Sequence, residues 1–480
     1  MKKLLIILLL PILPLIFSKI NYSDNGKRPW EKYLKNETLK LEIPDMQFFT
    51  LKNGIKVYFA ENTMLPRTFL KLYIEGGEFE ESADKTGLTS LWGDLVVYSG
   101  SQEYPREKLA EYLEKRASSF SFSSGLERAS FSVSSLSHFF KDDLNIFLSI
   151  LNAPRFFEED FSLLKKKTLK GIEKRKENPG GMAYIGSSLK LWENTTRGAI
   201  TTKKTIESIK NEDFLAWQKK MNSAERMTIL LAGDYKKEQI ENLLNETIGS
   251  LPFKNENLPN NTPLDKPPKN IQFKTFHIVK DIPQTTVLLT AKGINHASDD
   301  YYALKIYDFI LGGSSFNSML TREIRTKKGW AYSVYSHYSS GLRYGTIKIF
   351  AQTGNQNVFD LLKTVDSILS KPSDFIDENN LSDALQSLRN KFIFLYETPE
   401  DLVSTQLSLM WDGLKPDYLK NFISNLEKTN VNDLLSIAKK HYKSDDFFLI
   451  VVGPENLFSN QDAMKDIPWL KSIEKLEIPE

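Results

Sequence analysis

The side chains that most often bind metals or act as nucleophiles are few in this sequence. It contains no cysteine, which excludes disulfides, thiolate metal sites and a cysteine nucleophile. None of its five histidines has the i, i+4 spacing that would place two ligands on one face of a helix. They are His138, His277, His296, His337 and His441. Each is therefore expected to be a surface histidine or a hydrogen-bonded core histidine.

The stretch GLTSLWGDLVVYSGSQEYP, from Gly87 to Pro105, is typical of a helix that offers little chemistry. Its apolar residues recur with helical spacing at Leu88, Leu91, Trp92 and Leu95. The helical part has one carboxylate, Asp94, and Ser90 lies one turn before it. Because protein zinc sites use three or four His, Cys or carboxylate ligands, this pair with no adjacent base cannot hold zinc by itself.

The apolar patterns place these residues within an order of elements that occurs twice. The first half is expected to contain strands at 54–60 and 69–77, alternating strands in SFSFSS and RASFSVSSL, helices near 141–151 and 158–176, and the buried strand RMTILLAG. The second half runs from TTVLLTAKG through helices at 300–311 and in SMLTREIRTKKG, strands AYSVYSHYS and YGTIKIFAQT, two more helices, and FFLIVVGP as the final strand. The sequence therefore predicts an α+β protein of two similar domains, each a mixed sheet with helices packed on one face.

The segments at the start and middle of the chain divide it into regions. Two lysines and a short apolar run at 4–17 favour a secretory signal at 1–18, with an uncleaved anchor as the alternative. We expect an N-terminal domain at 40–250, a Pro/Asn-rich linker at 251–270 that limited proteolysis should cut first, and a C-terminal domain at 271–480.

The charged residues are balanced along the chain. The sequence has 63 Lys and Arg against 61 Asp and Glu, a formal charge of +2, without long basic blocks. A nucleic-acid partner is therefore not expected. No membrane contact is expected beyond the possible signal anchor.

The order and spacing of three segments carry a family resemblance. LKNGIKVYFAENTMLP, GLTSLWGDLVVYSGSQEYP and ILGGSSFNSMLTREIRTKKGWAYSVYSHYSSGLRYGTIKIFAQT are similar to segments of the pitrilysin/insulinase-like zinc metallopeptidases, the inverzincins. The two-domain bacterial and mitochondrial-processing-peptidase branch is the most similar one. The resemblance covers both domains and implies the two-domain fold of that family.

The family's zinc motif is lost at the corresponding positions. In the family an H-x-x-E-H helix supplies two ligands and the general base. Here Ser90 and Asp94 stand at the histidine positions and Gly93 at the base. The family's third ligand, a glutamate on a later helix, corresponds to Gly171, and Glu173 could replace it only in a shifted register. The resemblance therefore implies no zinc, no other cofactor and no hydrolysis by the chain alone. A weak metallopeptidase that uses Asp94 and Glu173 is an alternative.

The second domain keeps more of the family pattern. RTKKGWAY matches the family segment R-x-x-x-G-x-x-Y, whose Arg and Tyr, here Arg325 and Tyr332, would hold the peptide carbonyl and stabilise the oxyanion. The alternative is a solvated cation at a helix end and a half-buried strand aromatic. Gly312 and Gly313 resemble a glycine-bearing loop that approaches substrate, although paired glycines also simply end helices. In SSFSFSS, Phe122 departs from the family's substrate-binding edge strand.

The lost zinc motif and the kept Arg/Tyr pair together suggest a function. We expect an exported, non-catalytic subunit, periplasmic or envelope-associated in a bacterium, that binds peptide substrates together with a zinc-bearing paralogous peptidase subunit. The main alternative is a homodimeric peptide-binding or scaffold protein of the same fold.

Overall fold

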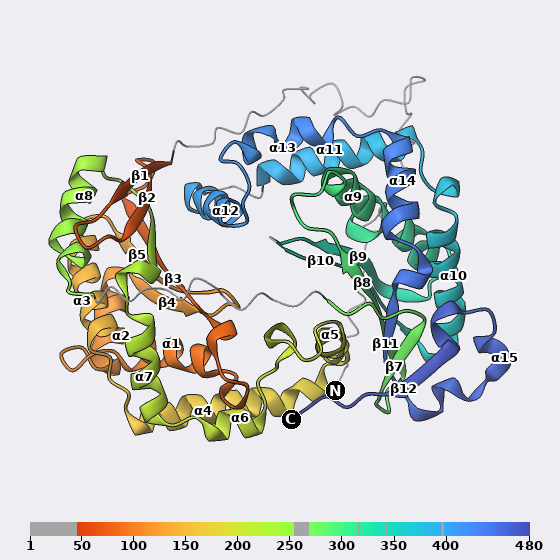
Figure 1. Ribbon diagram of the computed structural model, residues 1–480, viewed down its shortest axis with the longest axis horizontal. Helices are drawn as coiled ribbons and strands as arrows, with labels where there is room; N and C mark the ends of the chain where they lie inside the picture. Colours follow the sequence, from red (N-terminus) through yellow and green to blue (C-terminus); the bar gives the residue numbers. More distant parts are fainter. Residues whose placement is uncertain (1–45, 254–267, 315–316, 342, 395–397) are drawn as a thin grey trace, which may run out of the picture. The chain divides into compact units, whose positions relative to one another are not determined.

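The computed structural model describes residues 46–253, 268–314, 317–341, 343–394 and 398–480 (Figure 1). The expected signal at 1–18 and most of the expected linker, 254–267, lie outside the described residues. In the parts of the chain that are described, no helix is long and apolar enough to span a membrane.

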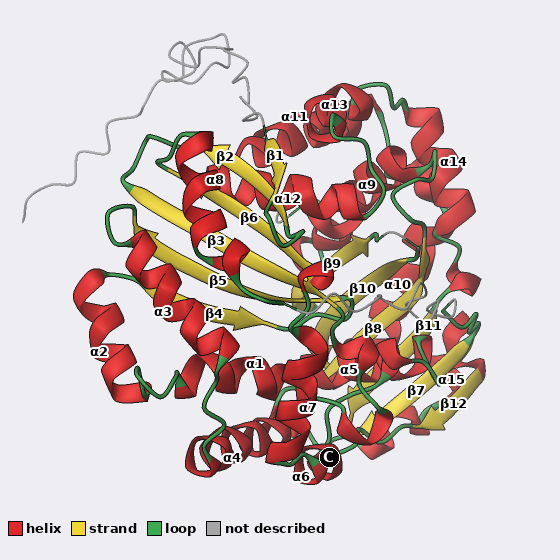
Figure 2. Cartoon of the chain, turned by 60° about the vertical axis from the view of Figure 1, so that its left-hand side comes forward, coloured by secondary structure: helices red, strands yellow, loops and turns green. Residues whose placement is uncertain are grey.

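The first half contains a six-stranded mixed sheet with the order β1-β2-β6-β3-β5-β4 (Figure 2). The strands are β1 Gln47–Thr50, β2 Lys56–Glu61, β3 Arg67–Glu75, β4 Ser119–Ser123, β5 Arg128–Leu136 and β6 Met227–Gly233. β2 and β6 are parallel, and the other neighbours are antiparallel. Alternate residues of β3 and β5 are buried, because one face of these strands packs against helices.

The second half contains a corresponding sheet with the order β12-β7-β11-β8-β10-β9. The strands are β7 Lys274–Val279, β8 Gln284–Gly293, β9 Ala331–Ser339, β10 Gly345–Gly354, β11 Phe448–Gly453 and β12 Ser472–Lys475. The order β7-β11-β8-β10-β9 repeats β2-β6-β3-β5-β4, and β7 and β11 are again parallel. Two similar α+β domains, each with a mixed sheet, are thus confirmed. The buried runs ILLAG and LIVVG lie in the corresponding strands β6 and β11.

The helices of the first half provide the main core on one face of its sheet. They are α1 Leu88–Ser99, α2 Arg106–Arg116, α3 Phe140–Asn152, α4 Glu158–Lys174, α5 Pro179–Leu191, α6 Lys203–Ser208, α7 Asn211–Met221 and α8 Lys237–Glu246. All except α5 contribute side chains to one apolar cluster with β2, β3, β5 and β6. This cluster fixes α1 against the sheet.

The helices of the second half differ in number from the sequence expectation. They are α9 Tyr301–Asp308, α10 Val358–Ser370, α11 Glu378–Phe394, α12 Pro399–Trp411, α13 Tyr418–Leu426, α14 Val431–His441 and α15 Gln461–Met464. Among the described residues between β10 and β11 there are five α-helices rather than two, because turns near Gly413 and Thr429 divide 399–441 into three short helices. FFLIVVGP is not the final strand, since β12 follows it.

The helices expected at 300–311 and in SMLTREIRTKKG are present, but each is partly π-helical. α9 ends at Asp308 and continues as a π-helical turn, Phe309–Gly313, and a second π-helical turn spans Thr321–Thr326.

Two helices pack on the sheet of the opposite half. Side chains of α5 form an apolar cluster with β7, β8 and β11, and side chains of α12 form another with β2 and β6. Each helix follows the long helix of its own half, begins at a proline, and is capped by the side chain of Asn178 or Thr398. The two halves therefore exchange equivalent helices, which no local sequence pattern indicated.

This exchange predicts that the two halves stay together after the linker is cut. A protease that cuts within 254–267 should leave both fragments associated, because the α5 and α12 clusters still bury apolar side chains across the halves. Native size-exclusion chromatography of the cut protein should give one peak that contains both fragments, and denaturant should separate them. Fragments that elute apart without denaturant would contradict the exchange. Early cuts within RMTILLAG would instead place the domain boundary elsewhere.

Candidate functional site

Helix α1, which carries the former zinc positions, is fixed at its N-terminus by a carboxylate. Gly87, at φ 103°, precedes the helix, and the backbone N–H groups of Gly87 and Thr89 donate to Glu81 at 2.9 and 2.6 Å. Burial raises the pKa of Glu81, and these hydrogen bonds oppose that rise. The indole of Trp92 donates to Gln218 at 2.7 Å inside the core. The helix is thus firmly positioned.

The positions predicted to be former zinc ligands offer few side chains that can bind a metal. Ser90 is half-buried and Asp94 is exposed. Although Asp94 lies at the surface, partial burial of its carboxyl group raises its pKa, and the charge of Lys167 opposes the rise. On α4, Gly171 and Glu173 are exposed, and a Cβ added at Gly171 would meet no other atom within 4 Å.

These residues do not fit a zinc ion. Among the residues that the structure describes, no group of three or more His, Asp or Glu side chains is placed to hold a metal. Serine and glycine offer no strong ligand, and one exposed carboxylate is too few.

An aromatic ring lies against Gly93, the position that the family resemblance assigns to the general base. A Cβ added at Gly93 would lie 2.2 Å from ring carbons of Phe122, which belongs to β4. This ring also packs against Trp92 and Phe131, with centroid distances of 5.7 and 4.8 Å. Glycine on α1 and phenylalanine on β4 therefore form a complementary pair. The sequence shows both residues, but only the structure shows that they are in contact.

Arg325 and Tyr332 lie together at the surface of the second half. The π-helical turn Thr321–Thr326 ends near Gly329, at φ 65°, and β9 begins two residues later. The guanidinium of Arg325 lies over the ring of Tyr332, 4.8 Å from its centroid. Tyr332 is 85% exposed, so its hydroxyl is accessible to another molecule. This cation–π contact orients two hydrogen-bond donors side by side.

The two glycines of the π-helical turn differ in their surroundings. Gly312 is buried, and a Cβ there would lie 2.1 Å from the backbone nitrogen of Ser336 on β9. Glycine at this position thus allows the turn to approach the strand. Gly313 is exposed and lines two cavities of about 510 and 420 Å³. Its position is accessible to a ligand, whereas that of Gly312 is not.

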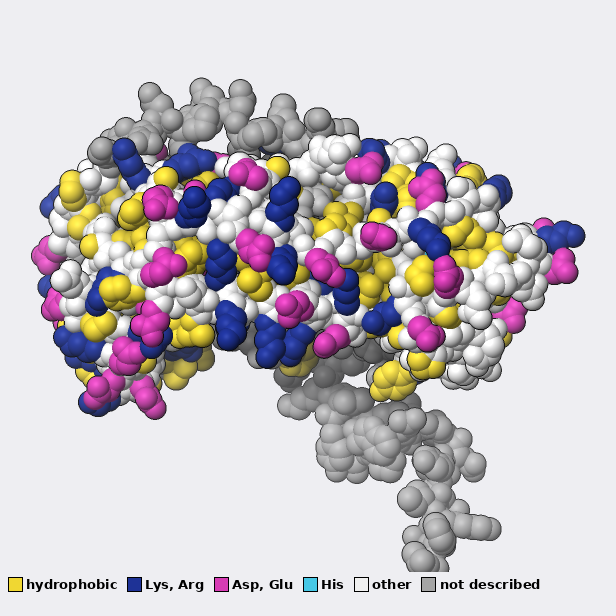
Figure 3. Space-filling model, turned by 90° about the horizontal axis from the view of Figure 1, so that it is seen from below, with side chains coloured by type: hydrophobic (Ala, Val, Ile, Leu, Met, Phe, Trp, Pro, Cys, Tyr) yellow, Lys and Arg dark blue, Asp and Glu magenta, His cyan; other side chains and the backbone are white. Residues whose placement is uncertain are grey.

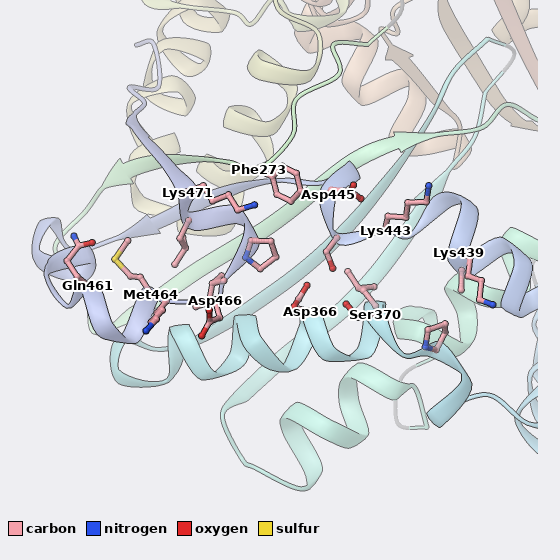
Figure 4. A pocket seen from close by; sticks show the side chains of 18 residues that line it. Phe273, Asp366, Ser370, Lys439, Lys443, Asp445, Gln461, Met464, Asp466 and Lys471 are labelled. Atoms are coloured by element: carbon pink, nitrogen blue, oxygen red, sulfur yellow. The ribbon is translucent and has the colours of Figure 1, made fainter.

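A further cavity, of about 960 Å³, lies beside α10, α14 and α15 (Figure 4). Charged side chains of both signs line it, among them Asp366, Lys443 and Lys471. None of the predicted site residues contributes to its walls.

The face shown in Figure 3 mixes basic and acidic side chains, without a continuous basic patch.

Two family models match this chain. Residues 56–194 match the model described as "Insulinase (Peptidase family M16)", and residues 208–388 match "Peptidase M16 inactive domain".

The chain is similar over most of its length to several relatives. A Helicobacter pylori protein called non-peptidase homolog YmxG is 24% identical over 83% of this chain and 92% of its own. A Pseudomonas fluorescens structure described as a peptidase M16 inactive domain has a TM-score of 0.74 at 23% identity, covering 85% of this chain and 98% of that one. The periplasmic protease PqqL of Escherichia coli has a TM-score of 0.72 at 15% identity, covering 86% of this chain and 47% of that one.

Proposed function

Because the chain belongs to peptidase family M16, we propose that it is the non-catalytic subunit of an exported metallopeptidase complex. The observation that carries this proposal is the contact between Gly93 and Phe122, which fills the position of the general base with an aromatic ring. The similarity to a non-peptidase homologue and to an M16 inactive domain is consistent with a pseudo-peptidase. The chain would contribute substrate binding while a zinc-bearing paralogue supplies the chemistry.

Arg325 and Tyr332 are the residues that would act on the partner's substrate. As the scissile carbonyl is attacked, its oxygen becomes an oxyanion, and a guanidinium and a phenol hydroxyl can donate hydrogen bonds to it. Their stacked arrangement costs little reorganisation during the reaction. The exposure of Tyr332 supports action in trans, because the pair is accessible from outside the chain.

Export is supported by two observations. The start of the sequence has the basic and apolar regions of a secretory signal. The structural neighbour PqqL is described as periplasmic. We therefore propose a periplasmic or envelope location.

The same fold also suits a homodimer that binds peptides or scaffolds an assembly without hydrolysis. A weak metallopeptidase that uses Asp94 and Glu173 is less well supported, since both side chains are exposed and a third ligand is missing. Elemental analysis of the purified chain would test that alternative directly.

Co-expression with an H-x-x-E-H-bearing M16 subunit from the same genome tests the proposal. We expect the two chains to co-purify, and the complex to cleave peptides faster than the zinc subunit alone, because the oxyanion donors are added. A control complex would carry a substitution in the zinc subunit's glutamate base and should be inactive. If the chains do not associate, and this chain forms a dimer with itself, the scaffold alternative replaces the proposal.

A further inference from the structure

Strands β3, β4 and β5 present a hydroxyl-rich surface on the face opposite the main core. On the core side, residues such as Leu72 and Phe131 are buried. On the opposite side, serines of β4 and β5 lie directly across from each other in the pairs Ser119–Ser134, Ser121–Ser132 and Ser123–Ser130. Lys71 of β3 lies directly across from Ser132. Trp411 of α12 covers part of this side, where its ring lies 4.7 Å from that of Tyr73. We call the remainder, on β4, β5 and the middle of β3, the open face of the first sheet.

Lys71 is half-buried on this face without an acidic partner. Its Nζ lies 4.9 Å from the centroid of the Tyr73 ring. Within the described part of the chain, no carboxylate lies within 4.0 Å of it. Burial alone lowers the pKa of its ammonium group. Because burying an unpaired charge is costly, such a lysine is a candidate for binding an anionic group.

The other charges on the open face leave a positive excess. Arg67 donates from Nε and Nη2 to the hydroxyl of Ser134, at 3.0 and 2.8 Å. Arg128 lies 4.3 Å from the Trp411 ring and 3.9 Å from the carboxylate of Glu75. Glu75 is the one acidic residue of β3, β4 and β5. Arg128 also lies 3.8 Å from the carboxylate of Glu127, so Arg67, Lys71 and Arg128 accompany two carboxylates.

On the second sheet, strands β8, β9 and β10 carry a lysine on the side against which α5 packs, where Ser187 of α5 hydrogen-bonds to Thr290. These strands contain no Asp or Glu. Lys348 of β10 lies across from Thr290 and His337, and its Nζ is 4.8 Å from the centroid of the Tyr184 ring. Burial alone lowers the pKa of its ammonium group as well. No carboxylate of the described ranges lies within 4.0 Å of this group. Two half-buried lysines, one on each sheet, are thus unpaired.

We propose that these two faces bind acidic peptide segments, whose carboxylates pair with Lys71 and Lys348 and whose polar groups hydrogen-bond to the paired serines of the first sheet. This inference rests on the peptide-handling part of the proposed function and names its substrate class. A carboxylate gains more from an ammonium that is already partly desolvated than from one in bulk water. The tyrosine rings hold each ammonium in place without neutralising it.

Fluorescence anisotropy with the purified chain tests this inference. The probes are labelled peptides of equal length, built of alternating Ser and Glu, Ser and Gln, or Ser and Lys. The Glu peptide should bind about tenfold more tightly than the Gln peptide at low salt, and its affinity should fall as the ionic strength rises. Equal affinities for the Glu and Gln peptides would overturn the proposal.

Matched variants distinguish the effect of these two lysines on peptide affinity from the effect of the net charge. The double variant Lys71→Gln/Lys348→Gln should bind the Glu peptide at least about tenfold more weakly. The control Lys166→Gln/Lys219→Gln changes the net charge equally at exposed lysines of α4 and α7, and should shift affinity by less than about twofold. Thermal unfolding of the first variant should be unchanged or occur at higher temperature, because an unpaired buried charge has been removed. Equal losses in both variants would refute the assignment.

Two further outcomes identify the ligand class and separate the two proposals. A single-stranded oligodeoxynucleotide that binds as tightly, and weakens in the same variant, would show a general polyanion surface and overturn the inference. These measurements need no partner subunit. Acidic-peptide binding without assembly would therefore reject the proposed complex alone, whereas assembly without an acidic preference would reject this inference alone.

Discussion

Gly93→Ala should destabilise the chain by about 1–2 kcal/mol, although alanine is the better helix former. The substitution gains about 1 kcal/mol of helix propensity. However, the new methyl group would lie 2.2 Å from the Phe122 ring, which Trp92 and Phe131 hold on other sides. Overpacking of this kind typically costs about 1–3 kcal/mol, and more where the neighbour cannot move. Urea denaturation followed by circular dichroism measures the effect.

A matched control for this prediction lies in α4. Gly171→Ala makes the same change within a helix where the new methyl group meets no atom within 4 Å. It should therefore stabilise the chain by about 0.5–1 kcal/mol. In a Phe122→Ala background, Gly93→Ala should become neutral or stabilising. Equal stabilisation by both single substitutions would show that the Phe122 ring does not fill the base position.

The same contact bears on attempts to restore the zinc motif. The triple variant Ser90→His/Gly93→Glu/Asp94→His places H-x-x-E-H on α1, but a glutamate side chain at 93 meets the Phe122 ring. We expect unfolding or aggregation of this variant, and elemental analysis of any soluble fraction should find no stoichiometric zinc. A folded variant with one zinc per chain would contradict this expectation.

Arg325→Ala and Tyr332→Phe should each lower turnover by the complex with a zinc-bearing subunit by about a hundredfold or more. Removing one donor from an oxyanion site commonly has this effect. Tyr332→Phe keeps the ring beneath the guanidinium and removes only the hydroxyl, so it separates hydrogen bonding from stacking. The measurement is kcat for a fluorogenic peptide, with subunit association and zinc content checked in parallel.

The control for these two variants is Lys327→Ala. Lys327 is an exposed cation two residues from Arg325, and it forms an ion pair with Glu323. It should leave turnover within about twofold, because a surface ion pair contributes little. If Arg325→Ala and Lys327→Ala behave alike, the Arg/Tyr pair is structural, and the homodimeric peptide-binding protein becomes the better account.

The sequence by itself determined that this chain contains no H-x-x-E-H motif. Residue identity decides whether a position can supply a metal ligand or a base, so the identities of Ser90, Gly93 and Asp94 are enough to exclude the zinc motif. The period-two pattern of RASFSVSSL also predicted a strand, because alternation follows from strand geometry alone. The repeated order of strands and helices predicted the two mixed sheets.

Only the tertiary structure decided which distant residues complement one another. Helix α5 was not predicted, since Gly180, Gly181 and Gly186 weaken its local helical signal, and it is stabilised by packing on β8 and β11 of the other half. The ring of Phe122 contacts Gly93, which lies 29 positions earlier in the sequence. The residues directly across from Lys71, Ser132 and Leu230, carry no charge. These contacts depend on where the chain brings remote segments together, which local periodicity and propensity do not specify.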